Sequence, residues 1–227
     1  MRSAPLPPCT RAGLPPLAPL RTARPADRAG CAYLQVAMTG KNCVAIASDQ
    51  RFGQQQLTLS TNMNKCFKMH DQLFLGMSGL VTDIQTLHDR FQFKMNLYSL
   101  KEDRLMKPRT FANVVASTLY ERRFGPYFVE PVIAGLENGV PYICGTDLIG
   151  AKDEPDDFIV SGTPYESLLG MAESLWRPDM EPDELFEVTA QTLMAATDRD
   201  CLSGWGGIVH VITPTEVITK TLKGRMD

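Results

Sequence analysis

Short apolar runs separated by turn residues dominate the chain between Tyr33 and Met77. Runs of four to eight such residues bounded by turn signals predict strands. We expect two antiparallel pairs in this part of the chain. The first joins Tyr33–Met38 to Cys43–Ser48, and the second joins Lys65–His70 to Leu73–Met77.

Two helices are predicted next, because apolar residues then recur at spacings of three and four. The first begins near Thr82, Pro108 breaks its pattern, and Thr110 is expected to be the N-cap of the second. The apolar faces are Ile84, Leu87, Phe91, Met95 and Tyr98, followed by Phe111, Val114, Val115 and Leu119.

The second half of the chain repeats this order of strands and helices. Asn138-Gly139 is a strong hairpin signal between two of its strands. Strands are predicted over Tyr127–Leu136, Val140–Gly145, Asp157–Val160, Gly207–Ile212 and Glu216–Leu222, with helices from Pro164 and over Asp183–Thr197. The inward faces of these helices are expected to hold Tyr165, Leu168, Leu169, Ala172 and Leu175, then Leu185, Phe186, Val188, Thr189, Leu193 and Met194.

The connections between strands are mostly too short for the crossovers that a parallel sheet needs. Two stacked antiparallel sheets with helix pairs on their outer faces would bury every apolar stripe. The pattern therefore predicts an α+β fold.

Composition sets the general class of protein. The chain has 227 residues, of which 44% are hydrophobic and 22% charged, as in one soluble globular domain. A net charge of −3 without a long basic run argues against nucleic acid as a partner, and no apolar run is long enough to span a membrane. The six cysteines are scattered, without the CxxC pairs or histidine spacing of a zinc site, so we expect no metal and a reduced compartment. We also expect no cofactor.

Residues 1–32 differ in composition from the rest. The first thirty residues hold seven prolines, five arginines and one acid, Asp27. We expect a disordered Pro/Arg-rich extension over 1–32 and a folded domain over 33–227. An Arg-rich, acid-poor segment also suits a transit peptide, although seven prolines disfavour an amphipathic helix. A propeptide, an unusual start site and a solvated tail remain open.

Five polar landmarks follow one another in a characteristic order. They are Asp49, Lys65 sixteen residues later, Ser78-Gly79, Ser161-Gly162-Thr163 and Asp200-Cys-Leu-Ser203-Gly204. In this order they resemble the active-site frame of proteasome β-type subunits, which are N-terminal-nucleophile hydrolases. The resemblance covers residues 33–227 and implies a four-layer αββα sandwich.

The resemblance also implies roles for these residues. In active members the lysine lowers the pKa of a threonine amine, and the aspartate holds the lysine. Lys65 and Asp49 match these two, although a purely structural ion pair explains them as well. Gly79 matches the oxyanion-hole glycine, or is simply a turn residue. Ser161, Asp200 and Ser203 match side chains that hydrogen-bond around the threonine.

The nucleophile position decides between active and inactive members. Counting sixteen residues back from Asp49 gives Tyr33, which has no aliphatic hydroxyl, and Ala32 replaces the glycine that self-cleavage needs. These residues imply a non-catalytic subunit, not an enzyme. The rival hypothesis is self-cleavage between Gly30 and Cys31, which would make Cys31 the nucleophile. It lies two residues out of register, about 6.6 Å along a strand.

Further stretches resemble one non-catalytic member of the family, among them Gly40–Ala47, Tyr120–Tyr127 and Glu130–Gly135. The resemblance implies a place in the β ring of the 20S core particle, with other α and β subunits as partners. It also implies that the chain forms part of the wall of the proteolytic chamber used in ubiquitin-dependent protein degradation, and that it is found in cytoplasm and nucleus. Asp147 is expected either to face a neighbouring subunit's pocket or to cap its own turn. A free-standing αββα binding protein is the third hypothesis.

Overall fold

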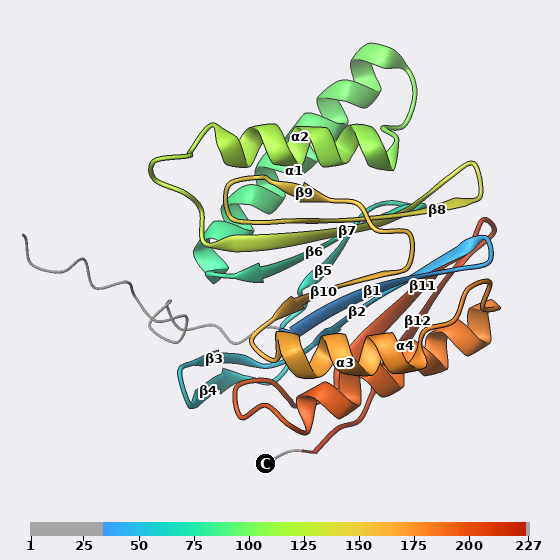
Figure 1. The fold of residues 1–227 in the computed structure, drawn as a ribbon. Coiled ribbons are helices and arrows are strands. Elements are labelled where there is room, and N and C mark those ends of the chain that lie inside the picture. Colours follow the sequence, from blue (N-terminus) through green and yellow to red (C-terminus); the bar gives the residue numbers. More distant parts are fainter. Residues whose placement is uncertain (1–33, 226–227) are drawn as a thin grey trace, which may run out of the picture.

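The computed structural model describes residues 34–225 as two antiparallel sheets stacked face to face, with a pair of helices on each outer face. Figure 1 shows the four layers in the order helices, sheet, sheet, helices. The prediction of an α+β sandwich of the αββα type is confirmed.

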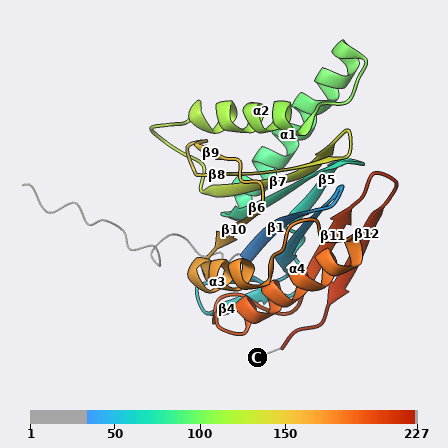
Figure 2. The same cartoon turned by 45° about the vertical axis from the view of Figure 1, so that its right-hand side comes forward.

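The first sheet contains the N-terminal and C-terminal strands and has the order β10-β1-β2-β11-β12. Its strands are β1 (Leu34–Gly40), β2 (Cys43–Asp49), β10 (Phe158–Gly162), β11 (Gly207–Ile212) and β12 (Val217–Leu222). Strand β1 pairs with both β10 and β2: Leu34 lies opposite Gly162, and Gln35 lies opposite Ser48. The start of β1 therefore lies beside the end of β10, as Figure 2 also shows.

The second sheet has the order β5-β6-β7-β8-β9. Its strands are β5 (Cys66–His70), β6 (Leu73–Gly79), β7 (Val129–Glu137), β8 (Val140–Thr146) and β9 (Lys152–Asp153). The predicted hairpin between β7 and β8 is confirmed, because Asn138 and Gly139 both have the positive φ values, 54° and 83°, that suit a tight turn.

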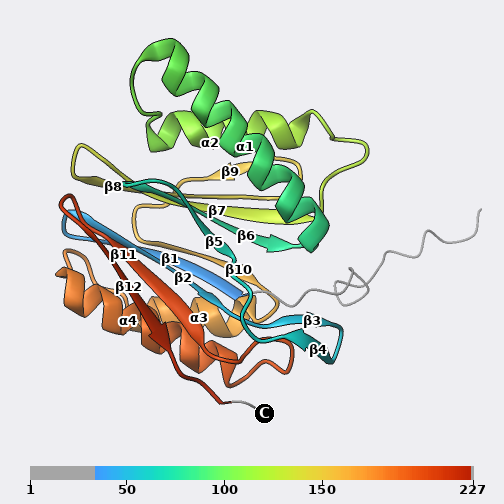
Figure 3. The same cartoon turned by 180° about the vertical axis from the view of Figure 1, so that it is seen from behind.

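Helices α1 (Val81–Glu102) and α2 (Pro108–Tyr120) cover the second sheet, and α3 (Tyr165–Leu175) and α4 (Pro182–Thr197) cover the first (Figure 1 and Figure 3). Each helix pair shares a buried apolar cluster with its sheet, and a third cluster lies between the sheets. Ile46, Phe74 and Ile143 belong to this third cluster, which holds the two sheets together.

The sequence pattern missed a small hairpin, β3 (Phe52–Gln54) and β4 (Leu57–Ser60), and the two-residue strand β9. Thr110 is not an N-cap. The cap position is Lys107, and Pro108 opens α2 because its fixed φ suits the first helical residue.

Two predicted inward-facing residues of α3 are in fact exposed, Tyr165 by 48% and Leu169 by 37%. Leu168 and Ala172 form the buried stripe instead, since a helix lying on a sheet buries only one face. Among the described residues, no helix combines the length and apolar character that membrane spanning requires.

Candidate functional site

An ion pair joins the two sheets at the start of β1. Asp49 is the last residue of β2, and Lys65 directly precedes β5 in the other sheet. The Lys65 Nζ lies 2.6 Å from the Asp49 Oδ1, with side-chain exposures of 3% and 0%. The predicted pair therefore forms, and it is fully removed from water.

Backbone N–H groups also donate to the Asp49 carboxylate. Leu34 N–H donates to Oδ1 at 3.1 Å, Arg51 N–H donates to Oδ2 at 3.3 Å, and the Gly204 N–H is a further partner. Burial raises the pKa of the Asp49 carboxyl, while the Lys65 ammonium and these N–H groups oppose that effect. The contact with Leu34 places the ion pair one residue from position 33.

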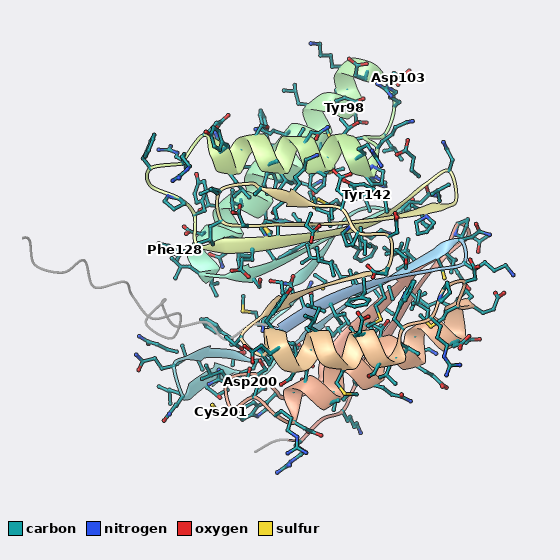
Figure 4. All side chains as sticks on the ribbon, in the orientation of Figure 1. Tyr98, Asp103, Phe128, Tyr142, Asp200 and Cys201 are labelled. Atoms are coloured by element: carbon teal, nitrogen blue, oxygen red, sulfur yellow. The ribbon has the colours of Figure 1, made fainter. Side chains whose placement is uncertain are left out.

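The loop after α4 brings Asp200 to the end of β10. The Asp200 Oδ2 accepts hydrogen bonds from the hydroxyls of Thr163 and Ser203, both at 2.6 Å, and its Oδ1 accepts the Leu202 N–H at 3.1 Å. Figure 4 labels Asp200 in this loop, beside the β3–β4 hairpin. The predicted Asp200 and Ser203 thus contact each other directly.

Ser161 belongs to a different cluster. Its hydroxyl donates to the Glu130 Oε2 at 3.0 Å and lies 3.4 Å from the Ser78 Oγ. Thr163, two residues later, is the side chain of the Ser161-Gly162-Thr163 segment that meets Asp200. The predicted side chains therefore form two groups: Ser161 contacts Ser78 and Glu130 of the other sheet, whereas Asp200 and Ser203 lie in the loop after α4.

The backbone explains why residue 79 is glycine. Its φ is +128°, and a Cβ there would lie 2.0 Å from the Phe128 carbonyl oxygen. Only glycine fits both the dihedral and this close approach. Gly79 ends β6 opposite Val129, directly after the Ser78 that contacts Ser161.

Arg51 is a residue of this region whose role the sequence did not reveal. It is 1% exposed, and its guanidinium donates to the Leu202 carbonyl at 2.7 Å, the Gln55 carbonyl at 3.0 Å and the Thr58 hydroxyl at 3.0 Å. It also lies 5.9 Å from the ring centre of Trp205. Arg51 thereby ties the β3–β4 hairpin to the loop that carries Asp200. The only signal in the sequence is its place two residues after Asp49.

Asp147 organises its own loop. Its Oδ1 accepts the N–H groups of Ile149 at 3.0 Å and Ala151 at 2.8 Å. The structure therefore gives Asp147 the capping role that was one of its two predicted roles. Contact with a neighbouring subunit stays a prediction.

Tyr33 and Cys31 lie outside the described residues, as does the predicted extension over 1–32. Residues 34–225 contain no group of three or more histidine, cysteine, aspartate or glutamate side chains that could hold a metal ion. The chemistry that this frame offers is a buried ammonium, held by a carboxylate that also accepts the Leu34 N–H at the start of β1.

Comparison with known proteins identifies the family of the chain. A family model described as "Proteasome subunit" matches residues 34–212. The chain belongs to the proteasome subunit family.

Three relatives within the proteasome family illustrate the degree of similarity. Proteasome subunit beta type-3 of Picea mariana is 58% identical over 193 residues, which is 85% of this chain and 95% of that protein. Proteasome subunit beta type-3-A of Arabidopsis thaliana is 56% identical over the same shares. Proteasome subunit beta type-3 of Drosophila melanogaster is 54% identical over 194 residues, again 85% and 95% of the two chains. The predicted resemblance to a β-type proteasome subunit is confirmed.

Proposed function

We propose that this chain is a non-catalytic β subunit of the 20S proteasome core. It completes the β ring between its α and β neighbours and walls the chamber in which ubiquitin-dependent protein degradation takes place. We further propose that it works in the cytoplasm and nucleus. The observation that carries the proposal is membership of the proteasome family at 54–58% identity to beta type-3 subunits.

The absence of catalysis is supported by the residues around position 33. An N-terminal threonine would supply both the nucleophilic hydroxyl and the basic amine of the family's reaction. Sixteen residues before Asp49 the sequence has Tyr33, and Ala32 precedes it. In this proposal the Asp49–Lys65 pair is retained as a structural link between the sheets, since its buried charges satisfy each other.

Exposed apolar side chains support a place in an assembly. Phe93, Leu97 and Leu100 follow one another at spacings of four and three along α1, with exposures of 66%, 54% and 85%. Phe124, in the turn after α2, is 99% exposed. A continuous apolar stripe of this kind is typical of a protein–protein contact.

Size-exclusion chromatography of a cell extract tests the proposal. The tagged full-length chain is expected to elute with the other proteasome subunits as a very large complex. A free species near 25 kDa would favour a free-standing binding protein instead.

A pair of variants sharpens this test. Leu97→Asp/Leu100→Asp places two charges in the exposed stripe and is expected to shift the chain out of the complex. Gln85→Glu/Asn96→Asp adds the same charge to exposed polar positions of α1 and is expected to assemble normally. Equal incorporation of both variants would show that this stripe is not a subunit contact.

A further inference from the structure

A groove runs along the edge where the two sheets meet. It has a volume of about 570 Å³ and lies between β10 and α3 on one side and the β7–β9 region on the other. Tyr165, Leu169 and Glu173 of α3 line it at a regular spacing of four residues, and all three are exposed. Tyr165 and Leu169 are the large apolar side chains of α3 that stay exposed, and they make this wall of the groove partly apolar.

The groove begins where the chain enters the fold. Gly162 is one of its lining residues and is the Cα partner of Leu34, the first described residue. Figure 1 shows the start of β1 beside the end of β10, next to the first turn of α3. The 33 residues that precede Leu34 are therefore attached at the mouth of this groove.

The groove and this preceding segment carry opposite charges. Five carboxylates line the groove, those of Glu130, Asp147, Asp153, Asp157 and Glu173. None of them forms a salt bridge within residues 34–225. The one lysine of the lining, Lys152, is paired with Glu154 at 2.8 Å. In contrast, residues 1–33 contain five arginines and one acid.

We propose that the Arg-rich segment before Leu34 binds in this acidic groove of its own chain. Arg28 lies six residues before Leu34 and Arg24 ten, so extended chain places them within about 20 and 35 Å of the groove's mouth. The five residues of β10 span about 17 Å. Both arginines can therefore reach the far end of the groove, where Asp157 directly precedes β10. The apolar residues of the segment cover Tyr165 and Leu169.

Photo-cross-linking in the full-length chain tests this inference. p-Benzoylphenylalanine replaces Leu169, and after irradiation the cross-linked peptides are mapped by mass spectrometry in both the assembled particle and the free chain. The expected partners are residues 22–32 of the same chain. The same probe replacing Leu100, which is 85% exposed in the last turn of α1, is expected to capture none of them. Tyr98 and Asp103, labelled in Figure 4, mark this end of α1.

Charge variants identify the cause of the binding. Asp153→Lys/Glu173→Lys is expected to lower the yield of this cross-link about fivefold, as the loss of two exposed ion pairs implies. Glu187→Lys/Glu216→Lys makes the same change of charge at exposed positions that do not line the groove and is expected to leave the yield unchanged. Arg24→Ser/Arg28→Ser is expected to give the same loss while residues 34–225 keep their sequence, so the test survives if the groove variant misfolds.

Two results would overturn the inference. One is a probe in place of Leu169 that captures only a neighbouring subunit, or nothing, in both preparations. The other is an undiminished yield in the arginine variant. A particle that assembles normally without the cross-link refutes this inference alone, whereas a chain that carries the cross-link but never enters the particle refutes only the proposed function.

Discussion

Removal of the Lys65 ammonium tests the structural role of the buried ion pair. In Lys65→Met the side chain keeps a similar length, but the Asp49 carboxylate loses the charge that lies 2.6 Å away. Since Asp49 is 0% exposed, water cannot replace the lost partner. Breaking a buried pair by removing one member costs about 3–5 kcal/mol, and we expect a loss of unfolding free energy in this range.

The loss should depend on pH. Burial raises the pKa of the Asp49 carboxyl, and removal of the lysine takes away an opposing contribution. A carboxyl whose pKa is higher in the folded than in the unfolded protein contributes stability at low pH that is lost as the pH rises through the folded pKa. The difference in unfolding free energy between Lys65→Met and the unaltered chain should therefore grow between pH 4.5 and pH 7.5.

Urea unfolding followed by circular dichroism at several pH values measures both effects. Lys68→Met is the matched control, because Lys68 pairs with Asp71 at 2.8 Å on the surface, with exposures of 52% and 87%. An exposed pair contributes about 0–1 kcal/mol. Equal losses in the two variants, or a loss in Lys65→Met that does not change with pH, would refute the account of the pair as a buried link between sheets.

Three further predictions concern single residues of the fold. Gly79→Ala should lower the unfolding free energy, measured in urea, by more than about 2 kcal/mol, because alanine is strained at a φ of +128° and its Cβ would collide with the Phe128 carbonyl oxygen. A loss below about 1 kcal/mol would contradict this. Burial lowers the pKa of His70, so the unfolding free energy should fall as the pH drops below about 6.5. His70→Gln should weaken this pH dependence in the same assay, and an unchanged dependence would exclude His70 as its source. Among the four cysteines of residues 34–225, iodoacetamide should modify the exposed Cys201 in the native protein and leave Cys66 unmodified, since burial raises the pKa of the Cys66 thiol to about 11. Peptide mass mapping that finds Cys66 modified as early as Cys201 would contradict this.

The main elements could be predicted because their signals are local. Asn138-Gly139 specifies a hairpin by itself, and the apolar spacing of α1 specifies a helix. The β3–β4 hairpin has no such signal: its turn uses Gln55 at a φ of 53°, without glycine, and Leu57 is exposed. Local pattern therefore gave no reason to place strands there.

The candidate site was predictable in part from the resemblance to proteasome β-type subunits. That resemblance implied a pair between Asp49 and Lys65, and the structure contains it. The role of Arg51 depends on the Leu202 carbonyl, 151 residues away, which no local pattern reveals. The hydrogen-bond partners around Asp200 also depend on packing, because Ser161 at the end of β10 donates to Glu130 while Thr163, two residues later, donates to Asp200.

The central claim is that this chain is a silent member of a proteolytic assembly. The most direct test is the intact mass of the chain isolated from core particles treated with a threonine-directed epoxyketone. The account predicts a chain without adduct and without an N-terminal threonine, serine or cysteine, while catalytic subunits of the same particle carry the probe. An adduct on this chain, or a mature N-terminus at Cys31, would contradict it.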